Sequence, residues 1–398
     1  MKQVSLLLGA GFSRPAGFPS TNDITNEILC GWDKWYKNGI QYRLKSNSRE
    51  EYDNSETALY PNYLEKVAYF LNLIKKEIEH YYSSIVKTDI RTNYEEIYDF
   101  VYHISYAFSR DIDNPITNRI IHSLVPSIKP LNEGNNDLYG ELENISNESL
   151  KFIKNVIKIE LNKEPLATTY LDIINELNNS TDLKLLSIFT TNHDLLLDNY
   201  LKDYIDGFAS ENNGVRLWDP MQWNIVDKLF YLKLHGSLNW YNFMKDTGVS
   251  YEIAFIGLIK KWYCHDANDY KIDGINYKVY NMPLYLTGTN DKYLECNYGI
   301  YLELFYQFHR LLKQTDILII IGYSFGDNAI NFRIIDWFGQ NKESKIILVT
   351  KCKYNTFNNA RGAINERLCE WEKIKNRFCV IEKLIENVSI EELLESIS

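Results

Sequence analysis

Short, almost wholly apolar runs recur along the chain and predict a β-sheet. Each of these runs has four to six residues, is rich in Ile, Leu or Val, and is bounded by turn residues: Val4–Leu8, Leu185–Phe189, Leu229–Leu234, Ile317–Ile321, Ile346–Val349 and Phe378–Ile381. Strands that are covered on both faces are apolar on both sides, whereas half-exposed strands alternate. Helical patterns separate several of the runs. We therefore expect an α/β fold, with a Rossmann-like, mostly parallel sheet and helices on both of its faces.

Residues 31–169 show helical rather than strand patterns. Apolar residues recur at spacings of three and four from Leu64 to Tyr81, which predicts one face of a long helix. Tyr94–Phe108 and Leu150–Ile159 have similar patterns, with polar loops such as Asn132–Asp137 between the helices. We therefore expect a Rossmann-like domain of residues 1–30 and 170–398, with residues 31–169 as a large, mainly helical insertion.

Charge and cysteine usage narrow the possible partners. The 43 Lys and Arg against 53 Asp and Glu give a net charge of −10, whereas proteins that coat nucleic acid or anionic membranes carry a basic excess. The longest apolar run, Ile317–Gly322, is far shorter than the roughly 20 residues of a membrane span. The six cysteines form no CxxC pair, which indicates reduced thiols rather than a zinc ribbon. We expect a cytoplasmic protein without direct nucleic-acid or membrane binding.

The turn after the first run contains two closely spaced glycines. Ligands of open parallel sheets bind beyond the carboxyl ends of the strands, so the residues that follow each run are candidate site residues. Gly9-Ala10-Gly11-Phe12-Ser13 would let backbone N–H groups approach a phosphate. Arg14 replaces the third glycine of the usual dinucleotide fingerprint. A tight turn without a ligand is therefore an equally good interpretation of this segment alone.

Polar residues also follow the later runs. Thr191–Asp194 come after the second run, His235 after the third, Gly322–Asp327 after the fourth and Thr350 after the fifth. Each has a structural explanation by itself: Asp194 could cap the next helix, and a histidine at a strand end is commonly a hydrogen-bonded structural residue. Together they place small or polar groups at five strand ends and add an imidazole that titrates near neutral pH. This combination predicts a nucleotide site.

These motifs resemble those of the sirtuin (silent information regulator) family. Gly9-Ala10-Gly11-Phe12-Ser13 resembles the first NAD loop of that family, and Thr191-Asn192-His193-Asp194 resembles its Thr-Gln-Asn-Ile-Asp motif. His235-Gly236 resembles the catalytic His-Gly, Gly322-Tyr323-Ser324 the later Gly-Thr-Ser loop, and Val349-Thr350 the Ile-Asn that binds near adenosine. The resemblance covers residues 1–30 and 170–398 and implies NAD as the ligand.

Two departures from the family pattern point to one branch of the family. The paired cysteines of the zinc module are missing, and Pro15–Ser20 stand in place of the Pro-Asp-Phe-Arg segment. The pattern is closer to the bacterial sirtuin-like branch of antiphage defence systems, whose members hydrolyse NAD to stop growth of an infected cell. The resemblance thus implies an NAD hydrolase that acts as an abortive-infection effector, with NAD as substrate and no metal.

The resemblance also implies roles for individual residues. Asn192 would hydrogen-bond the ribose hydroxyls or orient a water, and His235 would act as general base. Asp194 would position the ribose or cap the adjoining helix, and both interpretations stay open. We expect His193 to point away from the site. The residues expected to contact NAD are Gly9, Ala10, Gly11, Phe12, Ser13, Thr191, Asp194, Gly322, Ser324, Phe325 and Thr350.

Partners and rival functions follow from the same resemblance. The single-domain size resembles the subunit that works with a separate HerA-type hexameric ATPase, and gating of activity implies a homo-oligomer or a partner. One alternative is an NAD-dependent protein deacylase without the zinc module. Another is a non-catalytic module that binds NAD or ADP-ribose. The sequence leaves open the trigger, the subunit number, the role of the helical insertion, activity without a partner, and whether hydrolysis or cyclisation products form.

Overall fold

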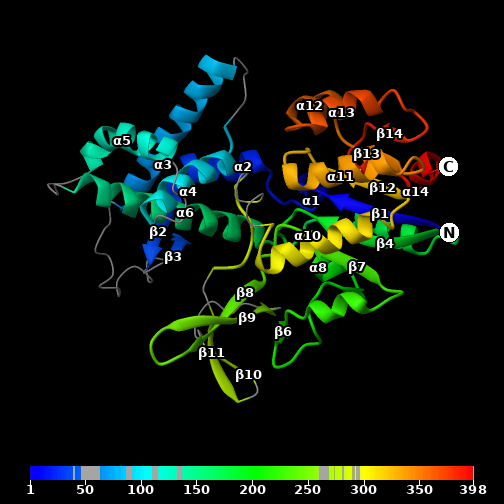
Figure 1. The fold of residues 1–398 in the computed structure, drawn as a ribbon, viewed down its shortest axis with the longest axis horizontal. Coiled ribbons are helices and arrows are strands. Elements are labelled where there is room, and N and C mark those ends of the chain that lie inside the picture. The colour runs from blue at the N-terminus through cyan, green and yellow to red at the C-terminus, as the bar shows by residue number, and fades with distance from the viewer. Residues whose placement is uncertain are drawn as a thin grey trace. The chain divides into compact units, whose positions relative to one another are not determined.

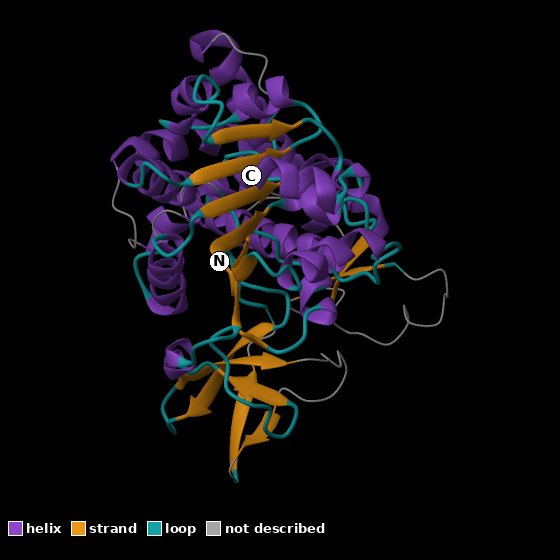
Figure 2. Cartoon of the chain, turned by 90° about the vertical axis from the view of Figure 1, so that its right-hand side faces the viewer, coloured by secondary structure: helices purple, strands orange, loops and turns teal. Residues whose placement is uncertain are grey.

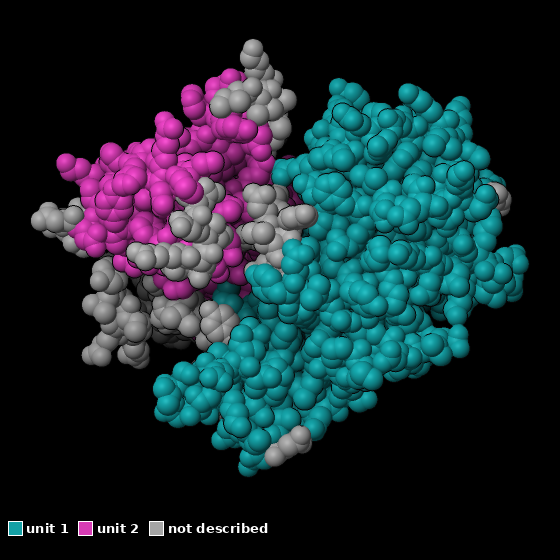
Figure 3. All heavy atoms as spheres, in the orientation of Figure 1, with its two compact units in different colours: residues 1–18, 161–286, 292–398 teal, residues 19–160, 287–291 magenta. Residues whose placement is uncertain are grey.

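The computed structural model divides the chain into two compact units. Unit 1 comprises Met1–Phe18, Leu161–Leu286 and Lys292–Ser398, and unit 2 comprises Pro19–Glu160 and Thr287–Asp291 (Figure 3). The structure describes residues 1–38, 41–45, 63–86, 92–109, 115–131, 137–259, 269–272, 274–279, 282–288, 292 and 296–397. Of the predicted loop Asn132–Asp137, all but Asp137 lies outside the described residues. The domain division inferred from the sequence, 1–30 and 170–398 against 31–169, remains a proposal.

Unit 1 is built on a seven-stranded sheet in which all strands run parallel. Its strands are β1 (Lys2–Leu8), β4 (Leu183–Thr190), β5 (Tyr204–Ile205), β7 (Leu229–Lys233), β12 (Ile317–Ile321), β13 (Lys345–Val349) and β14 (Phe378–Ile381). The structure therefore confirms all six predicted strands and adds the two-residue β5 at one edge. The prediction of an α/β fold with a mostly parallel sheet is confirmed.

Helices cover both faces of this sheet, which explains why its strands are apolar throughout. Leu6 and Leu7, which point to opposite faces of β1, are both fully buried. Helices α10 and α11 pack on one face, and α7 and α14 on the other. Figures 1 and 2 show helices on both sides of the sheet. The helices of unit 1 are α1 (Ala10–Ser13), α7 (Asp172–Asn178), α8 (Leu196–Tyr200), α10 (Gly299–Leu312), α11 (Asn328–Gln340), α12 (Lys353–Asn359), α13 (Ile364–Trp371) and α14 (Ile390–Ile397).

The strand order of this sheet reverses at one point. The spatial order is β14-β13-β12-β1-β4-β7-β5. When β5 is left out and the other six strands are numbered 1 to 6 along the chain, their spatial order from β7 to β14 is 3-2-1-4-5-6. This is the strand order of the Rossmann fold. The order reverses between β1 and β12, whose register pairs Leu8 with Ile321. Ligands of such sheets bind outside the carboxyl ends at this switch point, which is where the turns after β1 and β12 lie.

A second, antiparallel sheet in unit 1 was not predicted from the sequence. Its order is β10-β11-β8-β9-β6, and its strands are β6 (Val215–Leu217), β8 (Trp240–Asp246), β9 (Tyr251–Ile259), β10 (Asp269–Ile272) and β11 (Ile275–Val279) (Figure 2). Phe243, Tyr241 and Ile259 form part of its own small core. Exposed residues such as Ile253 and Ile275 lie in the same strands, so the apolar runs are broken and weakly diagnostic.

Unit 2 is mainly helical among its described residues. Its helices are α2 (Thr21–Cys30), α3 (Tyr63–Tyr81), α4 (Tyr94–Ser109), α5 (Pro115–Ile128) and α6 (Leu138–Leu161). The helices predicted over 64–81 and 94–108 are confirmed, and the one predicted over 150–159 is the second half of the longer α6. A hairpin of β2 (Trp35–Asn38) and β3 (Gln41–Leu44) was not predicted.

Candidate functional site

The turns after β1 and β12 approach each other backbone to backbone, and this approach requires glycine. A Cβ on Gly9 would lie 2.6 Å from the carbonyl oxygen of Gly322 and from Cα of Tyr323. A Cβ on Gly322 would lie 2.4 Å from the backbone nitrogen of Phe12, and its φ of +63° is a left-handed conformation that favours glycine. The glycines therefore allow the two site turns to pack against each other.

Part of the expected phosphate cradle is used within the protein. The N–H groups of Gly9 and Gly11 donate to the carbonyl oxygens of Ile321 and Gly322, both at 3.0 Å. Ala10 and Gly11 are exposed at this surface, whereas Phe12 is buried. The close spacing of the glycines therefore has a structural cause, and the exposed part of the turn is where a ligand can approach.

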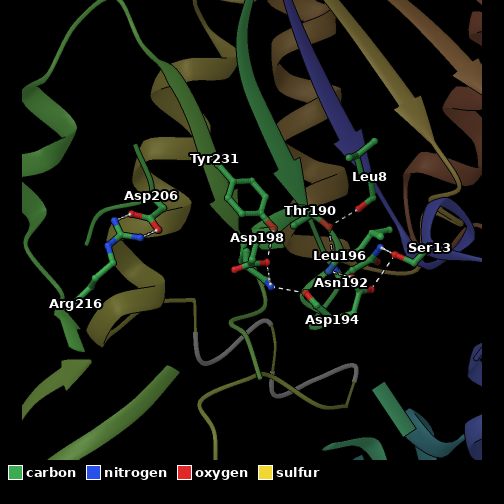
Figure 4. Close-up of polar contacts among 11 residues, drawn as sticks. Leu8, Ser13, Thr190, Asn192, Asp194, Leu196, Asp198, Asp206, Arg216 and Tyr231 are labelled. Atoms are coloured by element: carbon green, nitrogen blue, oxygen red, sulfur yellow. Dashed lines mark hydrogen bonds and ion pairs between the residues drawn. The ribbon is translucent and has the colours of Figure 1, made fainter. Parts of the chain in front are cut away.

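Ser13, Asn192 and Asp194 form a connected network at the ends of β1 and β4 (Figure 4). The Asn192 amide nitrogen donates to the carbonyl oxygen of Gly9 at 2.9 Å and to Ser13 Oγ at 3.0 Å. Ser13 Oγ in turn donates to Asp194 Oδ2 at 2.8 Å. Since both contacts of the Asn192 side chain use its nitrogen, its carbonyl oxygen faces away from Gly9 and Ser13. The structure thus brings three predicted site residues together and fixes the orientation of the half-buried Asn192.

Asp194 also contacts the start of the next helix, although the N-cap residue of that helix is Leu195. Its Oδ1 accepts the N–H of Leu196, the first residue of α8, at 3.1 Å. Burial raises the pKa of this carboxyl group, against the opposing effects of the Lys233 charge and the Ser13 hydrogen bond. One oxygen of Asp194 is therefore committed to the helix and the other to Ser13.

A buried lysine supports the same turn from β7. The Lys233 side chain is 2% exposed, and its ammonium group donates to the carbonyl oxygen of Asp194 at 2.5 Å and to Asp198 Oδ2 at 2.7 Å. Tyr231 donates to the same carboxylate oxygen at 3.1 Å (Figure 4). A buried ammonium group needs such partners because desolvation of an unpaired charge is costly. Sequence reasoning missed Lys233, which lies inside an otherwise apolar run.

His235, at the end of β7, pairs with an acid from the turn after β12. His235 Nε2 lies 2.7 Å from Asp327 Oδ2, and the two side chains are only 4% and 6% exposed. Burial opposes ionisation of Asp327, but the hydrogen bond and charge of His235 and the charge of Lys292 outweigh it and lower the pKa of Asp327. Asp327 ends the turn Gly322–Asp327 that the sequence indicated, but no contact or role was predicted for it. An aspartate just before a helix is readily explained as an N-cap, and its partner His235 lies 92 positions away in the sequence.

The expectation that His193 points away from the site is wrong. Its ring centroid lies 6.2 Å from that of His235 and 4.8 Å from that of Tyr285. Its carbonyl oxygen accepts the N–H of Leu238 at 3.1 Å and so ties the turn after β4 to the turn after β7. Burial, together with the charges of His235, Lys292 and Lys233, holds the pKa of His193 well below its usual value. His193 is therefore a buried, neutral neighbour of His235.

The remaining predicted residues differ in exposure. Ser324 is exposed at the turn after β12. Phe325 is fully buried in the core cluster of unit 1 and has a φ of +56°, an uncommon conformation for a bulky residue. Thr350 is half-buried, and its hydroxyl lies 2.7 Å from that of Thr356. Half-buried Thr191 donates its N–H to the carbonyl oxygen of Leu8 at 3.0 Å.

Two general features concern metals and membranes. Within the part of the chain that the structure describes, no group of three or more His, Cys, Asp or Glu side chains is placed to hold a metal ion. None of the helices described is both long and apolar enough to cross a membrane.

The likenesses of this chain to known proteins are structural and distant. No family model matches the chain, and no curated protein matches it. Similar solved structures include two single-residue mutants described as Sir2 homologues in complex with ADP-ribose. They are 11% and 12% identical to this chain, with TM-scores of 0.34 and 0.35, and each match covers 99% of this chain and 94% of the other. Because these likenesses are weak, the fold class rests on the strand order and the burial of the sheet.

Proposed function

We propose that the protein is an NAD hydrolase, which cleaves the nicotinamide–ribose bond with water to give nicotinamide and ADP-ribose. The observation that supports this most is the grouping of the sirtuin-like motifs at the switch point of the sheet. The oriented Asn192 follows β4 and the buried His235 follows the neighbouring strand β7, while the glycine turns after β1 and β12 pack together beside Asn192. A site for a dinucleotide is expected at this edge of a Rossmann-type sheet.

The chemistry demands little acid catalysis. The bond from ribose C1′ to the pyridinium nitrogen breaks with its electron pair on that nitrogen, so nicotinamide leaves neutral. A water oxygen bonds to C1′, and one proton of that water is released. Catalysis then depends on holding the ribose as it becomes positively charged and on placing the water. Asn192 would hold the ribose hydroxyls or the water through its carbonyl oxygen, and His235 would accept the proton.

The rest of the dinucleotide would follow the turns after β1, β12 and β13. Ala10, Gly11 and the neighbouring Gly9 and Ser13 would border the pyrophosphate, while Ser324 and Thr350 would lie toward adenosine. Phe12 and Phe325 have buried side chains and would contribute through their backbone. Thr191 and Asp194 would act by fixing the turn that carries Asn192.

We extend the proposal to a role in antiphage defence, in which the protein depletes NAD in an infected cell. The motif resemblance supports this role, as it supports a homo-oligomer and a HerA-type ATPase partner. The native mass of the protein, recorded alone and with a candidate ATPase, tests the assembly. A stable complex that changes the rate of NAD consumption is expected, and a monomer that the ATPase neither binds nor affects would contradict it.

Single substitutions test the assignment of the site. Asn192→Ala and His235→Ala should each reduce nicotinamide release at least 100-fold, because each removes a group proposed to act on the reacting ribose or water. His309→Ala is the control, since His309 lies in the last turn of α10, away from the carboxyl edge, and should leave the rate unchanged. Circular dichroism and thermal unfolding check the fold. Unchanged turnover in Asn192→Ala and His235→Ala would remove the basis of the assignment.

A further inference from the structure

The contact between His235 and Asp327 joins two site turns that are far apart in the sequence. His235 lies two residues after the end of β7, and Asp327 lies immediately before α11. The 2.7 Å distance between Nε2 and Oδ2 is that of a strong hydrogen bond to an ionised group, and both side chains are almost completely buried.

The carboxylate of Asp327 is fixed by contacts other than the histidine. Its second oxygen, Oδ1, accepts the N–H of Ile330 at 3.1 Å and so caps α11. The Asp327 N–H donates to the hydroxyl of Tyr323 at 3.3 Å, and the same hydroxyl donates to Asn331 Oδ1 at 3.1 Å. Rotation of the carboxylate would break either the cap or the contact with His235. The helix start therefore sets the position of the oxygen that faces the imidazole.

The charge of Asp327 decides which imidazole nitrogen carries the proton. The pKa of Asp327 is lowered despite its burial, so the group is a carboxylate and can only accept hydrogen bonds. His235 Nε2 must then be the donor, and in the neutral imidazole the lone pair belongs to Nδ1. Among the described residues, the other titratable or charged groups near the pair include neutral His193, Lys292, Cys296 and Tyr323, whose hydroxyl contacts the Asp327 backbone.

We propose that Asp327 is a positioning residue for the hydrolase: its carboxylate holds His235 with Nε2–H toward Asp327, so that proton acceptance falls to Nδ1. This inference rests on the proposed function for its catalytic consequence, whereas the orientation and tautomer of His235 do not depend on it. The proton accepted from water or a ribose hydroxyl forms an Nδ1–H bond, and Asp327 stabilises the resulting imidazolium.

The test separates the charge of Asp327 from its capping role. Asn caps helices as well as Asp does, so Asp327→Asn keeps a side-chain oxygen for Ile330. It also turns an amide N–H₂ group toward His235, which forces Nε2 to accept and moves the imidazole proton to Nδ1. We expect kcat/KM for nicotinamide release to fall about 10²- to 10⁴-fold in this variant, while its melting temperature stays above that of Asp327→Ala.

A matched control addresses the loss of a buried carboxylate as such. Asp206 is also buried and ion-paired, with Arg216 at 2.7 Å, and it accepts a backbone N–H from Phe208 at 3.1 Å. It lies just after β5, at the edge of the sheet. Asp206→Asn should therefore leave kcat/KM within twofold of the wild type. An equal loss of activity in Asp206→Asn and Asp327→Asn would overturn a specific role for Asp327.

A spectroscopic measurement decides the positioning role without any turnover. The ¹⁵N chemical shifts of the His235 ring, assigned by comparison with His235→Ala, report which nitrogen is protonated. We expect protonated Nε2 in the wild type and protonated Nδ1 in Asp327→Asn. Protonated Nδ1 in the wild type, or no change in Asp327→Asn, would overturn the proposal. If the wild type released no nicotinamide, the proposed function would fail, and this measurement would still decide the pair.

Discussion

At the residue scale, the side chains of Ser13, Asn192 and Asp194 each make more than one hydrogen bond, and the additional bonds fix their orientation. Ser13 accepts from Asn192 and donates to Asp194, and Asp194 also accepts the N–H of Leu196 at the start of α8. Most of the polar side chains behind the site are buried and hydrogen-bonded to one another. Breaking one of these bonds therefore disturbs its neighbours in the network. His193 is one exception, because its Nδ1 is buried without a hydrogen-bond partner in the described part of the chain, as are Ser237 Oγ and Asn239 Oδ1.

The burial of His193 makes stability depend on pH. Its pKa is held well below 6.5 in the folded protein, so below about pH 6.5 the unfolded chain binds a proton that the folded chain excludes. The free energy of unfolding should therefore fall as the pH decreases, by at most about 2 kcal/mol between pH 7 and 5 from this residue. His193→Gln removes the titration and should flatten the decline, as measured by urea unfolding at several pH values.

The control for this prediction is His80→Gln, which removes a histidine with an exposed side chain. The pH dependence of its unfolding free energy should follow that of the wild type. If His193→Gln and the wild type lose the same stability between pH 7 and 5, the folded protein tolerates a charged imidazole at this position and the interpretation is wrong.

At the element scale, the packing of the turns after β1 and β12 determines whether the site can form. Gly322 combines a positive φ with backbone atoms of Gly11 and Phe12 within 2.7 Å of any added Cβ. Gly322→Ala should lower the free energy of unfolding by at least about 2 kcal/mol, because the turn would have to both strain and separate. Chemical denaturation of the two proteins measures the difference.

Gly326→Ala is the matched control in the same turn. The nearest atom to a Cβ there is Ser324 Oγ at 3.7 Å, and its φ lies outside the left-handed region. Its free energy of unfolding should change by less than about 0.5 kcal/mol. Equal stability of Gly322→Ala and the wild type would show that the two turns are free to move apart.

Elements of continuous apolar sequence could be predicted, whereas elements defined by tertiary pairing could not. β12 is apolar at every position because helices cover both of its faces, so its sequence alone indicates a buried strand. The strands β8 to β11 expose much of one face, and β5 and β6 have only two and three residues. The contacts of Asp327 and Lys233 depend on strand order, which local patterns do not encode.

At the scale of the whole molecule, the candidate site residues belong to unit 1 and not to unit 2. The β-strand ends that carry the candidate site all belong to unit 1, and the motif resemblance covers that part of the chain. Unit 2 has its own buried core, with Val67, Ile97 and Ile153 fully buried on α3, α4 and α6. We expect the chemistry to be a property of unit 1 and leave unit 2 as a candidate surface for assembly.

The central claim is tested most directly by incubating the purified protein with NAD and no acyl-lysine peptide, and by quantifying the products chromatographically. The account predicts that nicotinamide and ADP-ribose appear in equal amounts and that His235→Ala abolishes both. Release of nicotinamide only when an acyl-lysine peptide is added would indicate a deacylase. Stoichiometric binding of NAD or ADP-ribose with no nicotinamide released, alone or with a candidate ATPase, would contradict the account.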